Sequence, residues 1–378
     1  MLASIATLLL AVSGCVTDED CSLNGLCTSG KCVCDSGWRG DDCGLVNLAP
    51  AVLGSGYNLT GEQQPISSWG GNIFPDEDPA KNPNTWHMYA SEFTEHCDIR
   101  HWSPNSRIIH AVSTSGPLGP YSFANEAVPA FAHNPKVLKA PDGTWLMYTI
   151  GVRLPKEKLF NCSAHLNNDG KPGRTPGNLE SNVTLYTSPS LTGPWTSQGV
   201  VLGEDDQGTW DEDTSNPSPW ILPSGEVLLM YRGCIVGGGG CYHEYIGVAS
   251  APSWRGPYTR LLKTPILRDT VAEDPSFWVD KRGHFHFLMH YIPDHTRVAR
   301  HAFARNYTGP WSLHTASIPY TTSVSLEGGG SIEFHKRERP YFVFNGTTPT
   351  HMITGVVSPG PWSGYQGPSY TLIQAVVP

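Results

Sequence analysis

The chain has 378 residues, of which 16% are charged, 40 are Gly and 32 are Pro. Few charges together with many turn-forming and aromatic residues are typical of many short strands and not of helices. The formal net charge of −9 argues against a nucleic-acid ligand, because phosphates bind to basic surfaces, and it suits a neutral ligand such as a sugar.

Residues 1–14 form an apolar run that ends in small residues, as secretory signal peptides do. The run is too short to span a bilayer, and no later segment is apolar enough to do so. We therefore predict a signal peptide over 1–14 and a secreted protein without a membrane span. The alternative, a bacterial lipoprotein signal that places a lipid on Cys15, conflicts with the use of Cys15 in the next segment.

Six of the ten cysteines lie between Cys15 and Cys43, separated by 5, 5, 4, 1 and 8 residues. So dense a set in so short a segment indicates a disulfide framework, which requires an oxidising compartment. Five Asn-x-Ser/Thr sequons agree with a eukaryotic secretory route and a glycoprotein; they begin at Asn58, Asn161, Asn182, Asn306 and Asn345.

This spacing, with Gly37 and Gly40 before the last cysteine, resembles the EGF family. The resemblance implies a small module over residues 15–45 that makes contacts with extracellular proteins. It also implies three disulfides: Cys15–Cys27, Cys21–Cys32 and Cys34–Cys43. The acidic run 18–20 faintly suggests a calcium-binding variant, but the rest of that pattern is missing, so a solvated acidic turn is the preferred interpretation.

From residue 46 onward a Gly-Pro-(Tyr or Trp) mark recurs five times, at 119–121, 193–195, 256–258, 309–311 and 360–362. The Pro residues are 74, 63, 53 and 51 positions apart, which suits a four-stranded propeller blade with its loops. Each mark follows strand–turn–strand patterns without a helical period. We therefore predict an all-β fold, a five-bladed β-propeller over 46–378 with each mark ending one blade.

Each repeat also opens with a recognisable segment. The innermost strand of a blade begins near the central axis, so the five openings should converge on one shallow pocket. The predicted openings are Trp69-Gly70-Gly71, His133-Asn134-Pro135, Ser215-Asn216-Pro217, Glu273-Asp274-Pro275 and Glu327-Gly328-Gly329.

Four cysteines remain outside the first module. Cys234 and Cys241 flank a glycine-rich loop that a disulfide between them would close. Cys97 and Cys162 could tie together the long loops of the first two blades.

The pattern of openings over residues 50–378 resembles the five-bladed glycoside hydrolases, chiefly family 43. In that family one carboxylic acid protonates the leaving oxygen and one carboxylate activates water. The resemblance places Glu273 at the position of the general acid. It places Asn216 where the family has an Asp that orients the acid, and Gly70 where the family has its catalytic base.

The general base must then come from elsewhere. Asp274 adjoins Glu273, but successive strand residues point to opposite faces, so Asp274 reaches the pocket only if the strand start is irregular. His133 opens the second blade and titrates near neutrality if unperturbed. Further candidates are Glu92, Glu95, His96, Asp211, Glu212 and Asp213.

Sugar-binding candidates are the opening residues Asn134, Asn216 and Trp69, whose ring can stack on a sugar, together with Arg232 and Glu327. His284, His286 and His290 share one strand face, and His284 and His286 could share a metal, but no third ligand is evident, so a polar strand face is the preferred interpretation. We predict no metal in the site and no required cofactor. A structural calcium ion remains compatible with the resemblance.

The sequence thus predicts a secreted glycoside hydrolase that acts on an extracellular or cell-wall polysaccharide, with Glu273 as general acid. The alternative is an inactive carbohydrate-binding or adhesion protein on the same scaffold. Gly70 at the expected base position and the EGF-like module favour that alternative.

Overall fold

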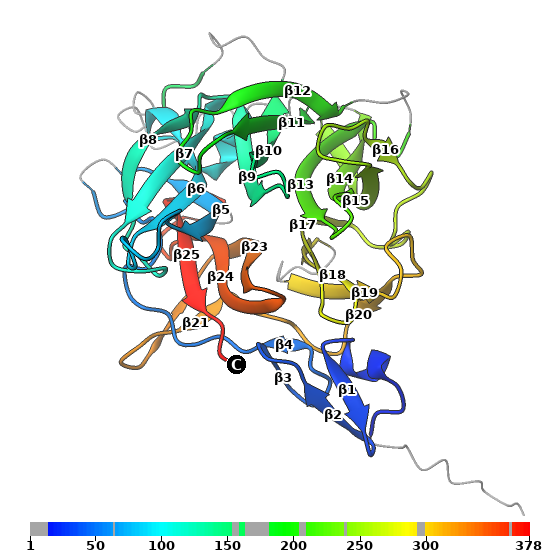
Figure 1. The fold of residues 1–378 in the computed structure, drawn as a ribbon. Coiled ribbons are helices and arrows are strands. Elements are labelled where there is room, and N and C mark those ends of the chain that lie inside the picture. Colours follow the sequence, from blue (N-terminus) through cyan, green and yellow to red (C-terminus); the bar gives the residue numbers. More distant parts are fainter. Residues whose placement is uncertain are drawn as a thin grey trace, which may run out of the picture.

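The computed structural model describes residues 14–62, 65–152, 159–162, 181–203, 209–237, 240–292, 299–362 and 365–378. Within these ranges the strands form a ring of five sheets, which confirms the predicted five-bladed propeller (Figure 1). The predicted signal peptide covers residues 1–14, and all of these except Gly14 lie outside the described residues. No helix in the described ranges is long and apolar enough to cross a membrane.

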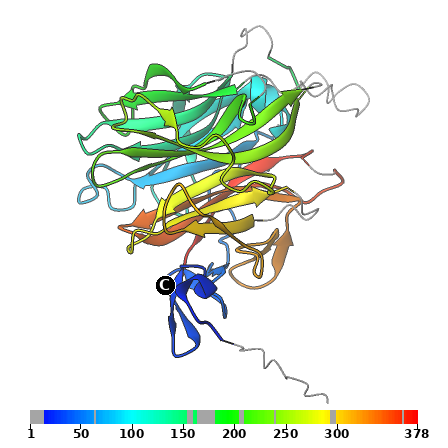
Figure 2. The same ribbon diagram turned by 90° about the vertical axis from the view of Figure 1, so that its right-hand side faces the viewer.

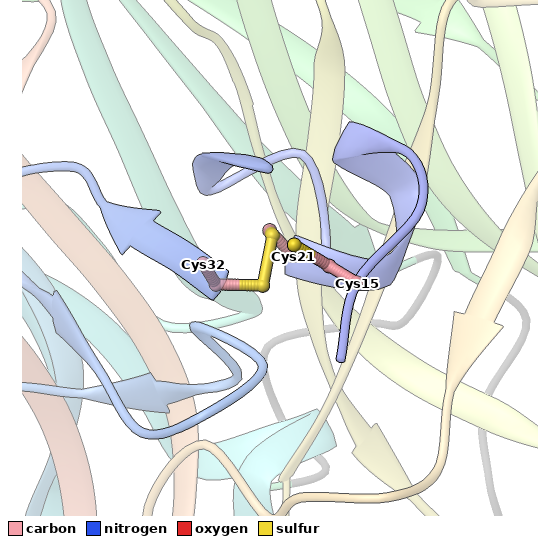
Figure 3. Close-up of side chains that lie close together, drawn as sticks. All are labelled: Cys15, Cys21 and Cys32. Atoms are coloured by element: carbon pink, nitrogen blue, oxygen red, sulfur yellow. A yellow bond between two sulfur atoms is a disulfide. The ribbon is translucent and has the colours of Figure 1, made fainter. Parts of the chain in front are cut away.

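The EGF-like module consists of one short helix and two small hairpins: η1 (Asp18–Cys21), β1 (Gly25–Thr28), β2 (Lys31–Cys34), β3 (Trp38–Arg39) and β4 (Leu45–Val46). All three disulfides implied by the resemblance are confirmed. Figure 3 shows the Cys21–Cys32 bond with Cys15 beside it. Crosslinks replace the hydrophobic core that so short a segment cannot form.

Each of the first four blades is a four-stranded antiparallel sheet. Blade 1 contains β5 (Ser68–Pro75), β6 (Trp86–Phe93), β7 (Ser106–Ser113) and β8 (Ser122–Val128). Blade 2 contains β9 (Ala132–Lys139), β10 (Trp145–Val152), β11 (Ser181–Ser188) and β12 (Thr196–Leu202). Blade 3 contains β13 (Asp213–Ile221), β14 (Val227–Gly237), β15 (Gly240–Ala251) and β16 (Thr259–Arg260). Blade 4 contains β17 (Ala272–Val279), β18 (Phe285–Tyr291), β19 (Ala299–Ala304) and β20 (Ser312–His314).

Blade 5 is built differently. It has three strands of its own, β23 (Lys336–Asn345), β24 (Thr348–Val357) and β25 (Ser369–Ala375). The outer edge of β25 is covered by residues that precede blade 1, since Tyr57 bridges to Thr371 and Leu48 to Val376. The two ends of the propeller sequence therefore close the ring together and leave no bare edge there.

The predicted opening of blade 5 at Glu327 is wrong. Glu327 lies in an exposed turn between β21 (Ser323–Ser325) and β22 (Ser331–Glu333), which form a separate hairpin. The innermost strand starts at Lys336, so the true opening is Glu338-Arg339-Pro340. The run of glycines after Glu327 supplies the positive φ angles of that hairpin turn.

The marks do not end the blades. In blades 1–4 each Gly-Pro-aromatic mark lies between the third and fourth strands, and all four Gly–Pro bonds are cis. The fifth mark, 360–362, lies between β24 and β25, the second and third strands of its blade. It is not equivalent to the other four, because the fourth strand position of blade 5 is filled from the N-terminal side.

The core lies between neighbouring blades. Met88 and Ile109 of blade 1 pack with Ile353 and Ile373 of blade 5, and similar clusters join the other pairs of blades. A short helical segment connects β6 to β7 and contains η2 (Thr94–His96), η3 (Ile99–His101) and α1 (Trp102–Asn105). Face-to-face packing of sheets around one axis places the five strand openings at one end of that axis.

The EGF-like module packs against blades 4 and 5 outside the ring (Figures 1 and 2). The Trp38 ring stacks on Trp278, with ring centroids 6.0 Å apart, and lies 5.3 Å from the ring of His301. Arg282 in the turn between β17 and β18 pairs with Asp35 of the module. The module is therefore docked on the propeller by a buried aromatic contact and an ion pair.

Candidate functional site

All five innermost strands share an irregular start. In each, strand pairing is interrupted by a β-bulge next to the opening. The second residue of each opening has a left-handed backbone; these residues are Gly70, Asn134, Asn216, Asp274 and Arg339, with φ between 50° and 61°. A bulge re-aims side chains, so Glu273 and Asp274 both reach the axial region, which was the condition set for Asp274.

These second residues form a ring across the axis. Asn216 Nδ2 donates to Asp274 Oδ1 at 2.8 Å, and Arg339 forms an ion pair with the same carboxylate. When the side-chain amide of Asn134 is oriented with its oxygen toward Arg339, this oxygen accepts a hydrogen bond from Arg339 Nε at 3.2 Å. A Cβ on Gly70 would lie 3.2 Å from Arg339 Cβ. The Arg339 side chain thus occupies the space beside Gly70 into which a base would project.

A cavity of about 350 Å³ adjoins this ring, a size suited to a small ligand. Its carboxylates are Glu244, Glu273 and Glu338, and its cationic or basic groups include Arg232, His290 and Arg339. Trp102 and Tyr365 contribute aromatic surface, whereas Trp69 borders the cavity but is only 1% exposed. The polar groups therefore converge within a partly aromatic wall, as sugar-binding sites require.

Glu273 is held as an ionised carboxylate. Its Oε1 lies 2.9 Å from His290 Nδ1, and the other ring nitrogen of His290 lies 3.5 Å from Glu338 Oε1. Burial by itself would raise the pKa of Glu273, but the hydrogen bond and charge of His290 lower it to about 2. Burial opposes the charge on His290, yet the Glu338 and Glu273 carboxylates raise its pKa to about 9.

Glu244 has the opposite environment. It lies on β15 directly opposite Cys234 of β14. Burial and the negative charge of Glu273 raise its pKa to about 7, although Arg232 lies 3.9 Å away and opposes the rise. At neutral pH the cavity therefore contains one carboxyl group that can carry a proton and another that is ionised.

The remaining acidic groups are also engaged. Tyr365 donates its hydroxyl to Glu338 Oε1 at 2.8 Å. Burial raises the pKa of Asp274 to about 7, against the influence of Arg339. Four carboxyl groups thus accompany three cationic groups at this place, so retaining a proton on one carboxyl balances the buried charge.

The structure brings most of the predicted residues together. Trp69, Asn216, Arg232 and Glu273 line the cavity. Asn134 and Asp274 lie in the ring beside it.

His133 and Glu327 do not line the described cavity. His133 is fully buried against the rings of Phe93 and Trp102, and its Nδ1 lies 2.8 Å from Ser106 Oγ. Burial lowers its pKa well below the usual value, so the predicted titration near neutrality is wrong. Within the described cavity wall none of the other suggested bases appears; Glu92, for example, is paired with Arg107.

Sequence reasoning missed Glu244 and Glu338, and it assigned His290 to a polar strand face and not to the site. Glu338 had a signal, since Glu338-Arg339-Pro340 repeats the Glu273-Asp274-Pro275 pattern at the correct strand start. Glu244 and His290 lie on the third strand of blade 3 and the second strand of blade 4, without a recognisable motif.

Among the described residues, two groups of side chains without disulfide-bonded cysteines have metal-ligand composition. Glu273, Asp274, His290 and Glu338 offer atoms within 4.8 Å of one another. Carboxylate oxygens suit calcium, but these carboxylates already bind His290, Tyr365, Arg339 and Asn216. Structural calcium stays a prediction, and the chemistry proposed below does not use it.

The second group consists of His284, His286 and Asp280. Asp280 is thus a third residue of ligand type beside the two histidines. Arg305 can only donate, and its Nη1 lies 3.2 Å from His284 Nε2, so the His284 proton is on Nδ1, facing Asp280. Both ring nitrogens that face Asp280 lie within 3.6 Å of its Oδ2. The Asp280 carboxylate thus faces both imidazoles, in keeping with the predicted polar strand face.

A family model of the Teneurin-like EGF domain matches residues 17–45. No curated protein sequence matches the chain. The first module is therefore EGF-like by both its disulfides and its sequence.

Solved structures similar to most of the chain include several glycoside hydrolases. A family 117 glycoside hydrolase from Zobellia galactanivorans has a TM-score of 0.58 and 16% identity, covering 90% of this chain and 91% of that one. An endo-arabinase from Bacteroides thetaiotaomicron has a TM-score of 0.50 and 12% identity, covering 86% of this chain and 98% of that one. An α-L-arabinofuranosidase from Lactobacillus brevis has a TM-score of 0.52 and 11% identity, covering 83% of this chain and 92% of that one. At these identities the likeness establishes the fold.

Proposed function

We propose that this protein is a secreted glycoside hydrolase that cleaves glycosidic bonds in an extracellular or cell-wall polysaccharide. The observation that carries the proposal is a single cavity containing Glu244 and Glu273, whose environments move their pKa values to about 7 and about 2. Two carboxyl groups with separated pKa values supply the acid and the ionised partner of glycoside hydrolysis. The propeller fold and the disulfide-rich module support the substrate class and the secreted location.

The roles differ from those expected from the sequence. Glu273 was predicted to be the general acid, but a carboxyl group with a pKa of about 2 has almost no proton to give at neutral pH. We assign the general acid to Glu244. Glu273 is then the ionised carboxylate that either activates water or attacks the sugar directly.

Other cavity residues position these two. His290 bonds to Glu273 and faces Glu338, so it holds both carboxylates in place and keeps Glu273 ionised. Trp102 offers aromatic surface for the apolar face of a sugar ring, whereas the predicted stacking residue Trp69 is buried. Arg232 and Asn216 present hydrogen-bond donors to sugar hydroxyls.

Carbohydrate binding without hydrolysis is the second candidate. Two observations favour it: Gly70 and Asn216 stand where the family resemblance expects carboxylates. On that interpretation the cavity binds a glycan and turns over none.

The test is turnover of a panel of aryl glycosides by wild type, Glu244→Gln and Glu273→Gln. On substrates with a poor leaving group we expect each substitution to lower kcat by at least roughly 10²-fold, as loss of a general acid or base does. Glu244→Gln should keep most activity on substrates with a good leaving group, which needs no protonation, whereas Glu273→Gln should lose activity on all substrates. The kcat profile of wild type should decline above a pKa of about 7, and the profile of Glu244→Gln should lack this decline.

Glu327→Gln is the matched control, because Glu327 is an exposed carboxylate away from the cavity; it should behave as wild type. Glycan binding by wild type with no turnover on the panel would refute hydrolysis in favour of carbohydrate binding. Unchanged kcat in Glu244→Gln on poor leaving groups would remove Glu244 from the acid role.

A further inference from the structure

The Cys234–Cys241 disulfide lies at the end of the β14–β15 hairpin, beside the cavity. Its cysteines are separated by 7 positions, the shortest separation of the disulfides that join the ten cysteines, all of which are described. Strand pairing continues past it, with Val236 opposite Cys241 and Gly237 opposite Gly240. The bond therefore crosslinks a hairpin that its backbone ladder already closes.

Such a bond contributes little to global stability. In the chain-entropy view the stabilisation from a disulfide grows with the logarithm of the loop it closes. The Cys97–Cys162 bond, with a separation of 65, constrains the unfolded chain far more. The position of Cys234–Cys241 needs another explanation, and its contacts supply one.

The sulfur of Cys241 contacts Arg232. Arg232 Nη1 donates to Cys241 Sγ at 2.8 Å, and Arg232 is only 4% exposed. Among the described residues its Nε has no hydrogen-bond partner. Its ion-pair partner Glu244 is at 3.9 Å, too far for a hydrogen bond. The disulfide sulfur is thus the short-range contact that fixes this guanidinium in the cavity wall.

Arg232 and Glu244 belong to the same hairpin as the disulfide. Glu244 lies directly opposite Cys234, and Arg232 precedes Cys234 by two residues on the same strand. In a strand that spacing places Arg232 on the same face as Cys234. The positive charge of Arg232 lowers the pKa of Glu244 against the effect of burial.

We propose that the Cys234–Cys241 disulfide is a positioning element of the active site, which holds Arg232 against Glu244 through the sulfur of Cys241. The inference rests on the proposed function, because it gives the disulfide a role in the environment of the proposed general acid. The bond acts through Arg232 and does not contact the reacting atoms itself.

The experiment compares wild type with Cys234→Ala/Cys241→Ala, Arg232→Gln and the triple variant. We expect the double variant to lower kcat by roughly tenfold to a hundredfold, as small misplacements at a site do. The alkaline limb of its pH profile should move to higher pH, because Glu244 loses the influence of Arg232. Arg232→Gln should show the same shift, and the triple variant should add nothing to it.

Cys97→Ala/Cys162→Ala is the control for losing a disulfide as such. It should lower the melting temperature more than the double variant at Cys234 and Cys241, and leave the alkaline limb in place. Additive effects of the disulfide and Arg232 substitutions, or an unshifted alkaline limb in Cys234→Ala/Cys241→Ala, would overturn the proposal.

A direct measurement separates this proposal from the proposed function. The pKa of Glu244 can be followed by ¹³C NMR of labelled carboxyl groups, assigned with Glu244→Gln, and needs no turnover. If wild type hydrolyses no glycoside, the proposed function fails. A higher Glu244 pKa in Cys234→Ala/Cys241→Ala would still support the positioning contact, and an unchanged pKa would refute it.

Discussion

At the scale of single residues, the openings show how backbone conformation limits the chemistry of the axis. Left-handed backbone favours Gly, Asn and Asp, and these occupy four of the five positions; only Arg339 is unusual. Arg339 adopts this left-handed conformation while its side chain forms an ion pair with Asp274. The ring is therefore selected for backbone tolerance and mutual hydrogen bonding, and Glu273, one residue earlier, is free to face the ligand.

Substitutions of Asn216 can separate the requirement for left-handed backbone from the requirement for hydrogen bonding. Asn216→Gly keeps the positive φ and loses the hydrogen bond to Asp274, which costs about 1 kcal/mol of unfolding free energy. Asn216→Ala loses the same bond and keeps a Cβ in left-handed backbone without the polar side chain by which Asn tolerates that conformation, so it should cost about 1 kcal/mol more than Asn216→Gly. Urea unfolding of both variants measures the difference. Equal stability of the two would contradict the role given to backbone strain.

At the scale of elements, the ring is closed by a segment far from blade 5 in sequence. Residues 47–57 run along β25, with Ala49 N donating to Ala375 O at 2.9 Å and Tyr57 N to Thr371 O at 3.0 Å. Ser55 Oγ donates to Ile373 O at 2.9 Å. These contacts supply the outer edge that the three strands of blade 5 lack, and they couple the N-terminal part of the propeller to its last strand.

Gly56→Ala tests this closure. A Cβ at Gly56 would lie 1.9 Å from Thr371 O on the backbone of β25, so docking of the segment must shift and the unfolding free energy should fall by roughly 1–3 kcal/mol or more.

Gly54→Ala is the matched control, because Gly54 also has positive φ but its Cβ would meet nothing within 4 Å. Thermal melts of the two variants distinguish a clash with β25 from backbone strain alone. A Gly56→Ala protein as stable as Gly54→Ala would show that the segment does not close the ring.

At the scale of the whole molecule, the module and the propeller meet through buried histidines. His301 lies between Asn24 of the module and His286 of the propeller, with nitrogen–nitrogen distances of 3.4 Å and 3.2 Å. The rings of His286 and Trp278 stack, with centroids 5.2 Å apart. Burial lowers the pKa of His301 well below its usual value and also lowers that of His286. Both imidazoles are therefore neutral in the folded protein.

This arrangement predicts a sign for the pH dependence of stability. Below an unfolded-state pKa of about 6.5 the unfolded chain binds protons that the folded chain does not, so stability falls as pH falls. Cavity groups with raised pKa values, namely His290, Glu244 and Asp274, act in the opposite direction. The expected result is therefore a difference: between pH 7 and pH 5 the melting temperature of wild type should decrease more, or increase less, than that of His301→Phe, which cannot titrate. Differential scanning calorimetry at the two pH values measures this. A larger decrease in His301→Phe would contradict the account.

The sequence by itself determined the local features. The presence of a disulfide framework and the five repeats followed from cysteine density, turn residues and strand patterns, which depend on neighbours in the chain. The disulfide pairing and the site position of Glu273 came from the family resemblances that these local motifs carry. Even the misplaced opening at Glu327 arose from a local signal, because a glycine-rich hairpin turn resembles the first opening, Trp69-Gly70-Gly71.

Only the tertiary structure decided which side chains share the cavity and what charge they carry. Glu244, Glu273 and Glu338 come from three blades, so their proximity depends on how the blades pack around the axis. Their pKa values depend on burial and on charges such as His290 and Arg232. For that reason Glu273 could be located from the sequence, whereas its ionised state and the acid assigned to Glu244 required the fold.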